Sequence, residues 1–376
     1  MSVRVCAGSG TLGAEQHVSR GDTVRIGVAG VGRIGALHAQ NLVAAVGAAN
    51  VLVADADAGR AQAAADTLGV ACAGDVDAML AAGVDGLVVA TPTDTHAALM
   101  LRGVEAGIPV FCEKPVAPDI AGTRAVLNRI QAMNGLVQVG FQRRFDAGYV
   151  AAQAAVAAGE LGQVHTITGH TLDPTPPPAA YVTVSGGIFR DCLVHDLDIL
   201  RWVSGQEVVE VYATGANLGD DYIRLAGDVD AVAVTLTMTD GSLAMLSASR
   251  YNLAGYDVRM EVRGHRSSVA VGLDPRTPVR SMEPMVYPSE PAYPGFLERF
   301  AGAYAAEMAA FVGLVRDGGT SRCTVADALA AFVLAEACEI SRRERRPVSI
   351  AEIESGGPTV PGQSGGRGFS VAEGVA

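Results

Sequence analysis

Two short segments of the chain carry side chains suited to moving a proton and stabilising negative charge. Lys114 stands between Glu113 and Pro115 at the end of an apolar run, where its ammonium can stabilise a developing alkoxide. Asp191 and His195 are four residues apart, so on a helix they share one face. A carboxylate one turn from an imidazole favours its protonated form, which predicts a pKa of His195 above about 6.5 and general acid–base chemistry near neutral pH.

The helix expected around Asp191 and His195 has two other interpretations. Asp198 falls on the same expected face, and a metal pair or a surface helix capped by Asp191 would show the same spacing. His165 and His170 add no metal ligands, because an odd spacing places them on opposite faces of a strand. We therefore expect no metal.

A glycine pattern typical of nucleotide sites follows the first apolar run. Gly30, Gly32 and Gly35 form GxGxxG between the segment VRIGVA and an amphipathic helix, with Arg33 and Ile34 completing the loop. The first glycine permits a tight turn, the second lets backbone amides approach a pyrophosphate, and the third allows close packing of helix on strand. The helix N-terminus favours an anion. A glycine-rich turn without a ligand is the alternative.

Asp55 ends the second apolar run and indicates which dinucleotide the site takes. It stands near the position, roughly 20 residues beyond the glycines, of the carboxylate that binds a ribose diol. Such a carboxylate repels a 2′-phosphate, so we expect NAD. Asp57 and Arg60 leave NADP open, and capping of the next helix, near Ala58, is the alternative role for Asp55.

Further polar side chains end the fourth and fifth apolar runs, where open α/β sheets bind ligands. Thr91, Thr93 and His96 follow GLVVA, and Glu113 and Lys114 end PVFCEK. Because the carboxyl ends of parallel strands meet at one edge, we expect Lys114 over the nicotinamide end of the dinucleotide. A lysine before a proline is otherwise typical of a solvated turn.

Positioning these residues requires a parallel sheet, and residues 24–143 have its pattern. Short β-branched runs alternate with Ala-rich helical stretches, and the runs lie at 24–30, 50–55, 70–73, 86–91, 109–114 and 136–141. Buried strands separated by helices predict an α/β fold with a doubly wound parallel sheet of the Rossmann type.

Residues 144–346 have a different texture and predict a second, α+β domain. Longer, alternating strands are expected at 163–171, 207–214, 230–238, 242–250 and 256–263, and helices at 190–203, 296–316 and 324–345. This pattern favours a mostly antiparallel sheet. We expect residues 1–23 to be a flexible extension and 347–376 a C-terminal segment that is disordered from about residue 354.

Composition narrows the classes of partner. The 376 residues include 28 Lys+Arg and 40 Asp+Glu, a net charge of −12, so neither nucleic acid nor a membrane surface is expected to bind. No apolar run is long enough for a transmembrane helix. The six cysteines lack a Cys-x-x-Cys pair, which fits a reducing cytoplasm.

Several motifs, taken in chain order, resemble one enzyme family. GVAGVGRIG, Asp55, TPTDTH, CEKPVA, VQVGFQRRFD and Asp191-x-x-x-His195-Asp196 resemble the Gfo/Idh/MocA oxidoreductases, and within them the inositol dehydrogenases. The resemblance spans about residues 24–346. It implies a Rossmann domain and a second domain whose large open sheet commonly mediates tetramers, so we expect a homotetramer. It also implies a catalytic set of Lys114, Asp191 and His195, with His195 as acid/base.

The resemblance also assigns residues to the cofactor and the substrate. The cofactor site then comprises the glycine loop, Asp55, the strand-end residues named above and, in addition, Gln142. At a polyol pocket, besides the catalytic set, the resemblance places Arg143, His170, Asp198 and Tyr256, and Asp173 is expected in the same pocket. The implied reaction has His195 removing a hydroxyl proton, Lys114 stabilising the alkoxide and contacting both cofactor and substrate, and Asp191 orienting His195.

Two departures from the inositol enzymes fall in the expected pocket. Where they read His-x-Asn-Pro-Thr, this chain reads His170-Thr-Leu-Asp173-Pro174-Thr175, and Cys192 takes a place usually held by Thr. Three prolines at 176–178 and Tyr181 mark a long loop beside that pocket.

We therefore expect NAD-dependent oxidation of a secondary alcohol of a cyclic polyol or sugar to a ketone, with myo- or scyllo-inositol as the leading substrate. A pyranose dehydrogenase of the same family is one alternative. A non-catalytic NAD-binding sugar sensor is an alternative of another class.

Overall fold

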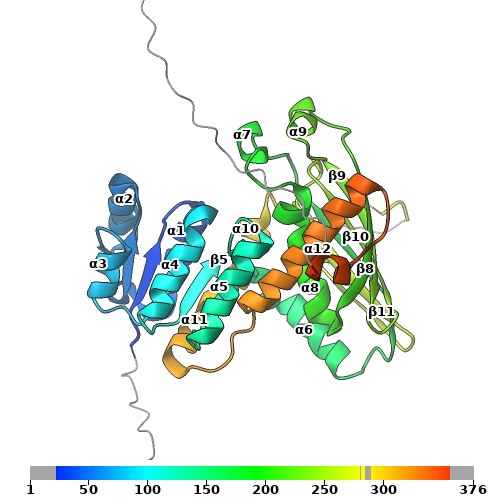
Figure 1. Ribbon diagram of the computed structural model, residues 1–376. Helices are drawn as coiled ribbons and strands as arrows, with labels where there is room; N and C mark the ends of the chain where they lie inside the picture. The colour runs from blue at the N-terminus through cyan, green and yellow to red at the C-terminus, as the bar shows by residue number, and fades with distance from the viewer. Residues whose placement is uncertain (1–22, 280, 284–288, 356–376) are drawn as a thin grey trace, which may run out of the picture.

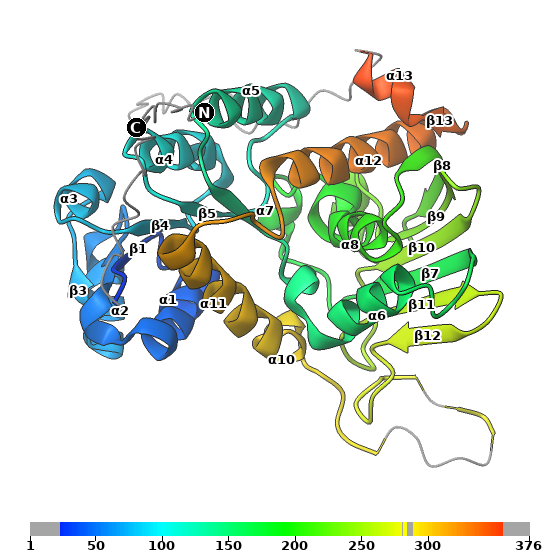
Figure 2. The same cartoon turned by 90° about the horizontal axis from the view of Figure 1, so that it is seen from below.

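Two sheets organise the part of the chain that the structure describes. This computed structural model describes residues 23–279, 281–283 and 289–355. A six-stranded sheet and a seven-stranded sheet lie beside each other, each covered by helices (Figure 1, Figure 2). The expected extension at 1–23 and the tail beyond 355 fall almost wholly outside the described residues.

The first sheet is parallel throughout and has the order β3-β2-β1-β4-β5-β6. Its strands are β1 (Ile26–Ala29), β2 (Val51–Ala54), β3 (Ala71–Cys72), β4 (Gly86–Val89), β5 (Val110–Glu113) and β6 (Val137–Gly140). The strand order reverses between β1 and β4, which is where ligands bind in doubly wound sheets. The predicted Rossmann architecture is confirmed.

The helices of this domain begin where short polar side chains satisfy free backbone N–H groups. They are α1 (Arg33–Val46), the 3-10 turn η1 (Ala48–Asn50), α2 (Ala58–Leu68), α3 (Val76–Ala81), α4 (Thr93–Glu105) and α5 (Ile120–Ala132). The side chains of Asp57, Asp75 and Asp119 each accept a hydrogen bond from a backbone N–H three residues further on. Asp57 therefore caps α2, and the capping role considered for Asp55 is wrong.

The second sheet has the order β12-β11-β7-β10-β9-β8-β13. Its strands are β7 (Val164–Leu172), β8 (Val208–Ala216), β9 (Ala231–Met238), β10 (Leu243–Ser249), β11 (Asp257–Gly264), β12 (Ser268–Val271) and β13 (Val348–Ser349). Every pairing is antiparallel except that of β7 with β10, so the mostly antiparallel sheet is confirmed. The edge strands β12 and β13 were not expected, because they are too short for alternation to show.

Helices cover one face of the second sheet and join it to the first domain. They are η2 (Gln142–Phe145), α6 (Ala147–Ala157), α7 (Ala179–Val182), η3 (Phe189–Leu193), α8 (Val194–Ser204), α9 (Asp221–Leu225), α10 (Phe296–Arg299), α11 (Ala301–Asp317), α12 (Val325–Glu344) and α13 (Ile350–Glu354). The helix expected over 296–316 breaks at Phe300. The helix expected over 190–203 begins with a π-helical turn, η3.

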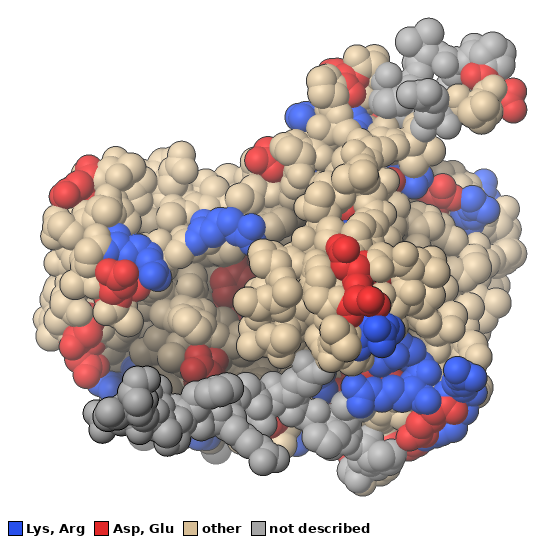
Figure 3. All heavy atoms as spheres, turned by 90° about the horizontal axis from the view of Figure 1, so that it is seen from above, with Lys and Arg blue, Asp and Glu red and all other residues tan. Residues whose placement is uncertain are grey.

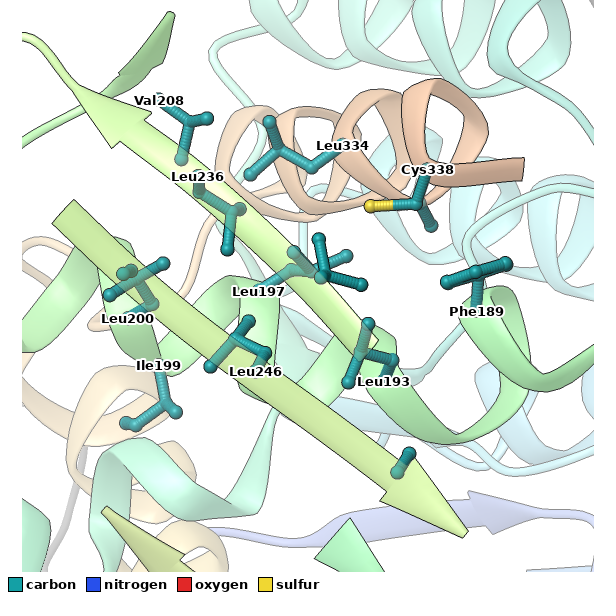
Figure 4. Close-up of a cluster of buried hydrophobic side chains, with 14 of the residues drawn as sticks. Phe189, Leu193, Leu197, Ile199, Leu200, Val208, Leu236, Leu246, Leu334 and Cys338 are labelled. Atoms are coloured by element: carbon teal, nitrogen blue, oxygen red, sulfur yellow. The ribbon is translucent and has the colours of Figure 1, made fainter. Parts of the chain in front are cut away.

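Helix α8 is held between the second sheet and α12. Leu193, Leu197 and Leu200 face this core, and each is fully buried. They pack with Leu236 and Leu246 of the sheet and with side chains of α12 (Figure 4). This packing fixes the helix that carries His195.

Helix α11 returns from the second sheet to the first domain. Its buried residues Met308, Phe311, Leu314 and Val315 share a core with strands β1, β2, β4 and β5. Figure 2 shows α11 beside α1. The two domains are therefore connected by packed secondary structure as well as by the chain crossing at η2.

Candidate active site

The glycine loop after β1 has the geometry of a dinucleotide site. Gly30 has φ +86°, and a Cβ there would lie 2.6 Å from the carbonyl oxygen of Ala90. A Cβ at Gly35 would overlap the carbonyl oxygen of Gly30, whereas one at Gly32 would meet nothing within 4 Å. Gly32 also begins α1 without a side-chain cap, so its N-terminal N–H groups remain available to an anion. These features fit the pyrophosphate of NAD.

Asp55 lies at the tip of β2 and faces this loop. Its Oδ2 accepts a hydrogen bond from the N–H of Val31 at 2.9 Å, and its Oδ1 accepts one from the N–H of Asp57 at 2.9 Å. Arg60 approaches both Asp55 and Asp57, at 3.4 and 3.5 Å. The guanidinium is thus shared between two carboxylates, which leaves less of its charge for a 2′-phosphate.

His96 connects the ends of β4 and β5. Its Nε2 lies 2.7 Å from the carbonyl oxygen of Thr91 and its Nδ1 lies 2.8 Å from that of Pro115. The ring is 2% exposed. The enclosed ring lies between the two carbonyl oxygens, and a neutral imidazole donates to one of them, so His96 braces the strand ends. We infer a supporting role for it in place of the expected direct contact with the cofactor. Thr93 begins α4 beside it.

Glu113 and Lys114 extend from the end of β5 toward different partners. Glu113 Oε1 is hydrogen-bonded to His38 Nε2 of α1 at 2.7 Å. Lys114 Nζ donates to the backbone carbonyl oxygen of Asp191 at 3.0 Å. The ammonium therefore reaches from the cofactor domain to the π-turn of the second domain.

Asp191 and His195 do not pair as the helical spacing predicted. In the described part of the chain no hydrogen bond joins them. Asp191 Oδ1 accepts from the hydroxyl of Tyr181 at 2.8 Å, and its Oδ2 accepts from Nη1 of Arg250 at 3.3 Å. Residues 189–193 form a π-turn, which holds one more residue per turn than an α-helix and so changes the direction of Asp191 relative to His195.

The pKa of His195 is lowered well below its ordinary value of 6.5, because the protein buries the ring and because Lys114 and Arg143 place positive charge nearby. The expected raised pKa is therefore wrong. Nδ1 is enclosed without a partner among the described residues, and the ring packs edge-on against Phe141 at 5.6 Å between centroids. A neutral imidazole in this place is ready to accept a proton at Nε2.

Arg143 forms a buried polar cluster beneath His195. It donates to Asp196 Oδ1 and to Thr171 Oγ1, both at 2.8 Å, and Thr171 donates to Asp196 Oδ2 at 2.6 Å. Arg143 is 1% exposed, so its charge acts on the pocket from below. Asp196 was not assigned from the sequence, although it directly follows His195 in the motif that carried the resemblance.

Two residues expected in the polyol pocket face elsewhere. Asp198 is fully buried and accepts hydrogen bonds from Arg144 with both carboxylate oxygens, at 2.6 and 2.9 Å. His170 Nδ1 is bonded to Ser247 Oγ on the neighbouring strand at 2.8 Å, whereas Thr171 faces Asp196. Because strand residues alternate, His170 lies on the outer face of the sheet and Thr171 on the site side. Both pocket assignments are therefore corrected.

Asp173 and Cys192, the positions that depart from the inositol enzymes, contact each other. Cys192 Sγ lies 3.7 Å from Asp173 Oδ2, a weak hydrogen bond. Burial first, and then the charge of Asp191, raise the pKa of Asp173 to about 6. Tyr256 is 6% exposed, and burial raises the pKa of its hydroxyl while the charge of Arg143 opposes that rise. Asp173 therefore lies within the electrostatic reach of Asp191 and Arg143, and Tyr256 within that of Arg143.

Arg250 is a site residue that sequence reasoning missed. It is 1% exposed and bridges Asp191 and Asp228, at 3.3 and 3.2 Å. Asp228 Oδ1 in turn accepts the N–H of Ile188, at the start of the π-turn. Arg250 is the last residue of the strand expected at 242–250. This position at a strand end, the signal used for Lys114 in the first sheet, could have pointed to it.

The described residues contain no group of three or more His, Cys, Asp and Glu side chains that could hold a metal ion. Within them, no helix is long and apolar enough to cross a membrane. The face in Figure 3 is hollowed left of its centre, with acidic side chains visible inside the hollow. Basic side chains lie above and to the left of the hollow, and a larger group of them lies at lower right beside acidic ones.

Comparisons with known proteins identify the family. Residues 24–141 match the model of the oxidoreductase family with an NAD-binding Rossmann fold, and residues 149–270 match the GFO/IDH/MocA C-terminal domain. The chain belongs to the Gfo/Idh/MocA oxidoreductase family. The resemblance noted in the sequence, and NAD as the cofactor of the Rossmann domain, are thereby confirmed.

Members of this family with similar sequences and structures are named for inositol. An inositol 2-dehydrogenase of Rhizobium meliloti (strain 1021) is 39% identical over 330 residues, which are 88% of this chain and 100% of that protein. A myo-inositol dehydrogenase of Corynebacterium glutamicum has a structure that is 38% identical with a TM-score of 0.80, over 87% of this chain and 98% of that one. A scyllo-inositol dehydrogenase of Lactobacillus casei, with bound NAD(H) and scyllo-inositol, is 29% identical with a TM-score of 0.78, over 88% and 100%.

Proposed function

We propose that this member of the Gfo/Idh/MocA family oxidises one secondary hydroxyl of a cyclic polyol to a ketone, with NAD as the oxidant and myo- or scyllo-inositol as the substrate. The observation that carries the proposal is the hydrogen bond from Lys114 to the π-turn that leads to His195. This contact lies at the carboxyl edge of the Rossmann sheet, where doubly wound sheets bind their ligands. The named functions of the similar proteins supply the substrate class.

The residues of the site divide the chemistry as follows. Bound at the glycine loop, NAD would supply the hydride acceptor for the carbinol carbon. His195 enters the reaction neutral and takes the hydroxyl proton at Nε2. Lys114 stabilises the developing alkoxide, and its hydrogen bond to the Asp191 carbonyl oxygen holds the ammonium in place. Asp191, fixed by Arg250, contributes to the polyol pocket.

The cofactor and the substrate take different sets of residues. At the cofactor we place Gly30, Gly32, Arg33, Ile34, Gly35, Asp55, Thr91, Thr93, Lys114 and Gln142, with His96 and Glu113 in support. At the substrate we place Lys114, Asp173, Asp191, His195 and Tyr256, above the buried Arg143. Gln142 is 5% exposed and precedes Arg143 in η2, the crossing between the domains.

We further propose that the protein is a homotetramer in the cytoplasm. The outer face of the second sheet exposes Val209, Tyr212, Leu243 and Met245, each more than two-fifths exposed. An apolar sheet face of this kind is typical of a protein interface. The free cysteines in the described part of the chain suit a reducing compartment.

A panel of inositols and pyranoses, incubated with NAD and assayed for NADH, tests the function. We expect turnover with myo- or scyllo-inositol at the highest kcat/KM. Turnover restricted to pyranoses would favour a sugar dehydrogenase of the same family. Tight NAD binding with no turnover of any polyol or sugar would support the sensor and contradict the proposal.

A further inference from the structure

The segment between β7 and the π-turn forms a projection beside the site. It leaves β7, passes the three prolines at 176–178, forms the short helix α7 and turns back at Gly186 and Gly187. Both glycines have left-handed φ, +82° and +89°, a conformation that side chains rarely adopt. In Figure 1, α7 and α9 stand next to each other at the upper edge of the second domain.

Contacts at both ends hold this projection in place. The hydroxyl of Tyr222 in α9 donates to the carbonyl oxygen of Pro177 at 3.0 Å. At the other end, the N–H of Ile188 donates to Asp228, which also binds Arg250. The end of the segment that carries α7 is therefore anchored to the same charged group that binds Asp191.

The side chain of Tyr181 extends from α7 to the π-turn η3, which precedes α8. Its hydroxyl donates to Asp191 Oδ1 at 2.8 Å, yet the side chain is 46% exposed. Burial and the charge of Asp191 raise the pKa of this hydroxyl, while Arg250 and Arg33 oppose the rise. Tyr181 therefore stays neutral, with its hydroxyl directed at Asp191.

This geometry lets one hydroxyl serve both the protein and a ligand. A phenol that donates its proton to a carboxylate keeps two lone pairs that accept hydrogen bonds. A polyol hydroxyl placed beside Asp191 can donate to the Tyr181 oxygen, and a second polyol hydroxyl can donate to the remaining lone pairs of the carboxylate. Half of the tyrosine faces open space, which is where such a ligand would lie.

We propose that Tyr181 is a specificity-determining residue that binds a ring hydroxyl of the substrate next to the one being oxidised, with α7 forming the outer wall of the polyol pocket. This inference rests on the proposed function. In this proposal the loop after β7 recognises a hydroxyl group next to the reacting one, whereas Lys114 and His195 act at the reacting carbon.

The test combines a variant of the enzyme with variants of the substrate. Tyr181→Phe removes one oxygen from a half-exposed side chain, so the fold should be retained. We expect KM for the best polyol to rise about tenfold, with kcat changed by less than about threefold and KM for NAD unchanged, because the lost hydrogen bond is to the ground-state substrate. Monodeoxy analogues of that polyol are then assayed with both proteins.

The deoxy analogues separate contact from indirect effects. With the wild type, one monodeoxy analogue should have a kcat/KM about tenfold below that of the parent polyol. With Tyr181→Phe, the same analogue and the parent polyol should have nearly equal kcat/KM, since the contact is already absent. Tyr251→Phe is the matched control, because Tyr251 also donates to a carboxylate, Asp220, but makes no contact with Asp191. It should behave as the wild type does.

Two results would overturn the inference. One is an unchanged KM for the polyol in Tyr181→Phe, with the wild-type penalty for every deoxy analogue. The other is a change in KM for NAD alone, which would place Tyr181 at the cofactor. If instead the wild type turns over no polyol with NAD, the proposed function itself fails, and that result is obtained before any variant is made.

Discussion

Lys114 is a single residue that joins the two domains at the site. Its backbone continues β5 and its ammonium binds the carbonyl oxygen of Asp191. Lys114→Met keeps the apolar stem and removes the charge. We expect kcat to fall about 10²-fold or more, the loss typical of an oxyanion stabiliser, with the circular dichroism spectrum unchanged. A fully active variant would remove Lys114 from the mechanism.

The charge state of His195 predicts how polyol oxidation depends on pH. Oxidation needs the neutral ring, and burial together with Lys114 and Arg143 lowers its pKa below 6.5. At saturating NAD, the kcat/KM for the polyol should therefore rise with pH below pH 6.5, as His195 loses its proton. Above pH 6.5 the titration of His195 should cause no further change in kcat/KM. Ketone reduction, which needs the imidazolium, should be favoured at the acidic end.

The same cause supplies a control for the pH profile. Removing the Lys114 charge should move the His195 limb to higher pH, because one of the groups that lower the pKa is gone. A wild-type limb above pH 6.5 would instead support the raised pKa inferred from helical spacing. Identical limbs in the wild type and in Lys114→Met would show that the two side chains are not close during turnover.

Asp55 predicts the choice between the two nicotinamide dinucleotides. Its carboxylate faces the glycine loop, and Arg60 is shared between two carboxylates. We expect NAD to be preferred over NADP by at least about tenfold in kcat/KM, and Asp55→Ala to narrow the difference. Equal use of both cofactors by the wild type would contradict this assignment and direct attention to Arg60.

Residues that follow a strand end could be placed from the sequence. Residues whose side-chain direction depends on the exact register or on a distant partner could not. The glycine loop, Asp55 and Lys114 needed only the end of a buried strand and the edge that parallel strands share. His170 was misplaced because a shift of one residue on a strand changes its face. Asp198 was misplaced because its partner, Arg144, is distant in sequence.

At the scale of elements, the π-turn before α8 explains why the predicted Asp191–His195 pair is absent. A regular helix places residues four apart on one face, but residues 189–193 wind more widely. Nothing in the composition of FRDCL distinguishes a π-turn from an α-turn. The wider turn lets Asp191 bind Arg250 and Tyr181 with its carboxylate and Lys114 with its carbonyl group.

Helix α11 carries a buried acid that reduces stability. Glu307 is fully buried, both its carboxylate oxygens lack partners among the described residues, and burial with the nearby Glu113 raises its pKa well above 4.5. Because the unfolded chain releases this proton at lower pH than the folded one, the cost grows as pH rises from 4.5 toward the folded pKa.

Glu307→Met should therefore stabilise the protein. We expect the free energy of unfolding, measured with urea, to rise by about 1–3 kcal/mol at pH 7.5 and by less at pH 4.5. Glu298→Met, on the exposed side of α10, is the control and should change stability little. A destabilised Glu307→Met at neutral pH would show that this carboxyl makes an interaction that the fold requires.

At the scale of the whole molecule, the fold class followed from periodicity and the placement of the two domains did not. Short, continuously apolar runs between helices are sufficient to predict a parallel sheet, and long alternating strands predict a mostly antiparallel one. The return of α11 to the Rossmann core was not foreseen, because the apolar stripe of a helix shows that it packs but not against what. The site depends on that placement, since Lys114 and His195 come from different domains.

The proposed reaction moves a hydride from a ring carbon of a polyol to NAD. The most direct measurement uses myo-inositol carrying deuterium at every ring carbon and determines the mass of the NADH formed. We expect the NADH to have gained one deuterium and, when hydride transfer limits the rate, to form more slowly than from unlabelled substrate. A His195→Gln variant should form it much more slowly than the wild type. NADH without deuterium, or deuterated NADH formed equally fast by that variant, would contradict the proposed reaction.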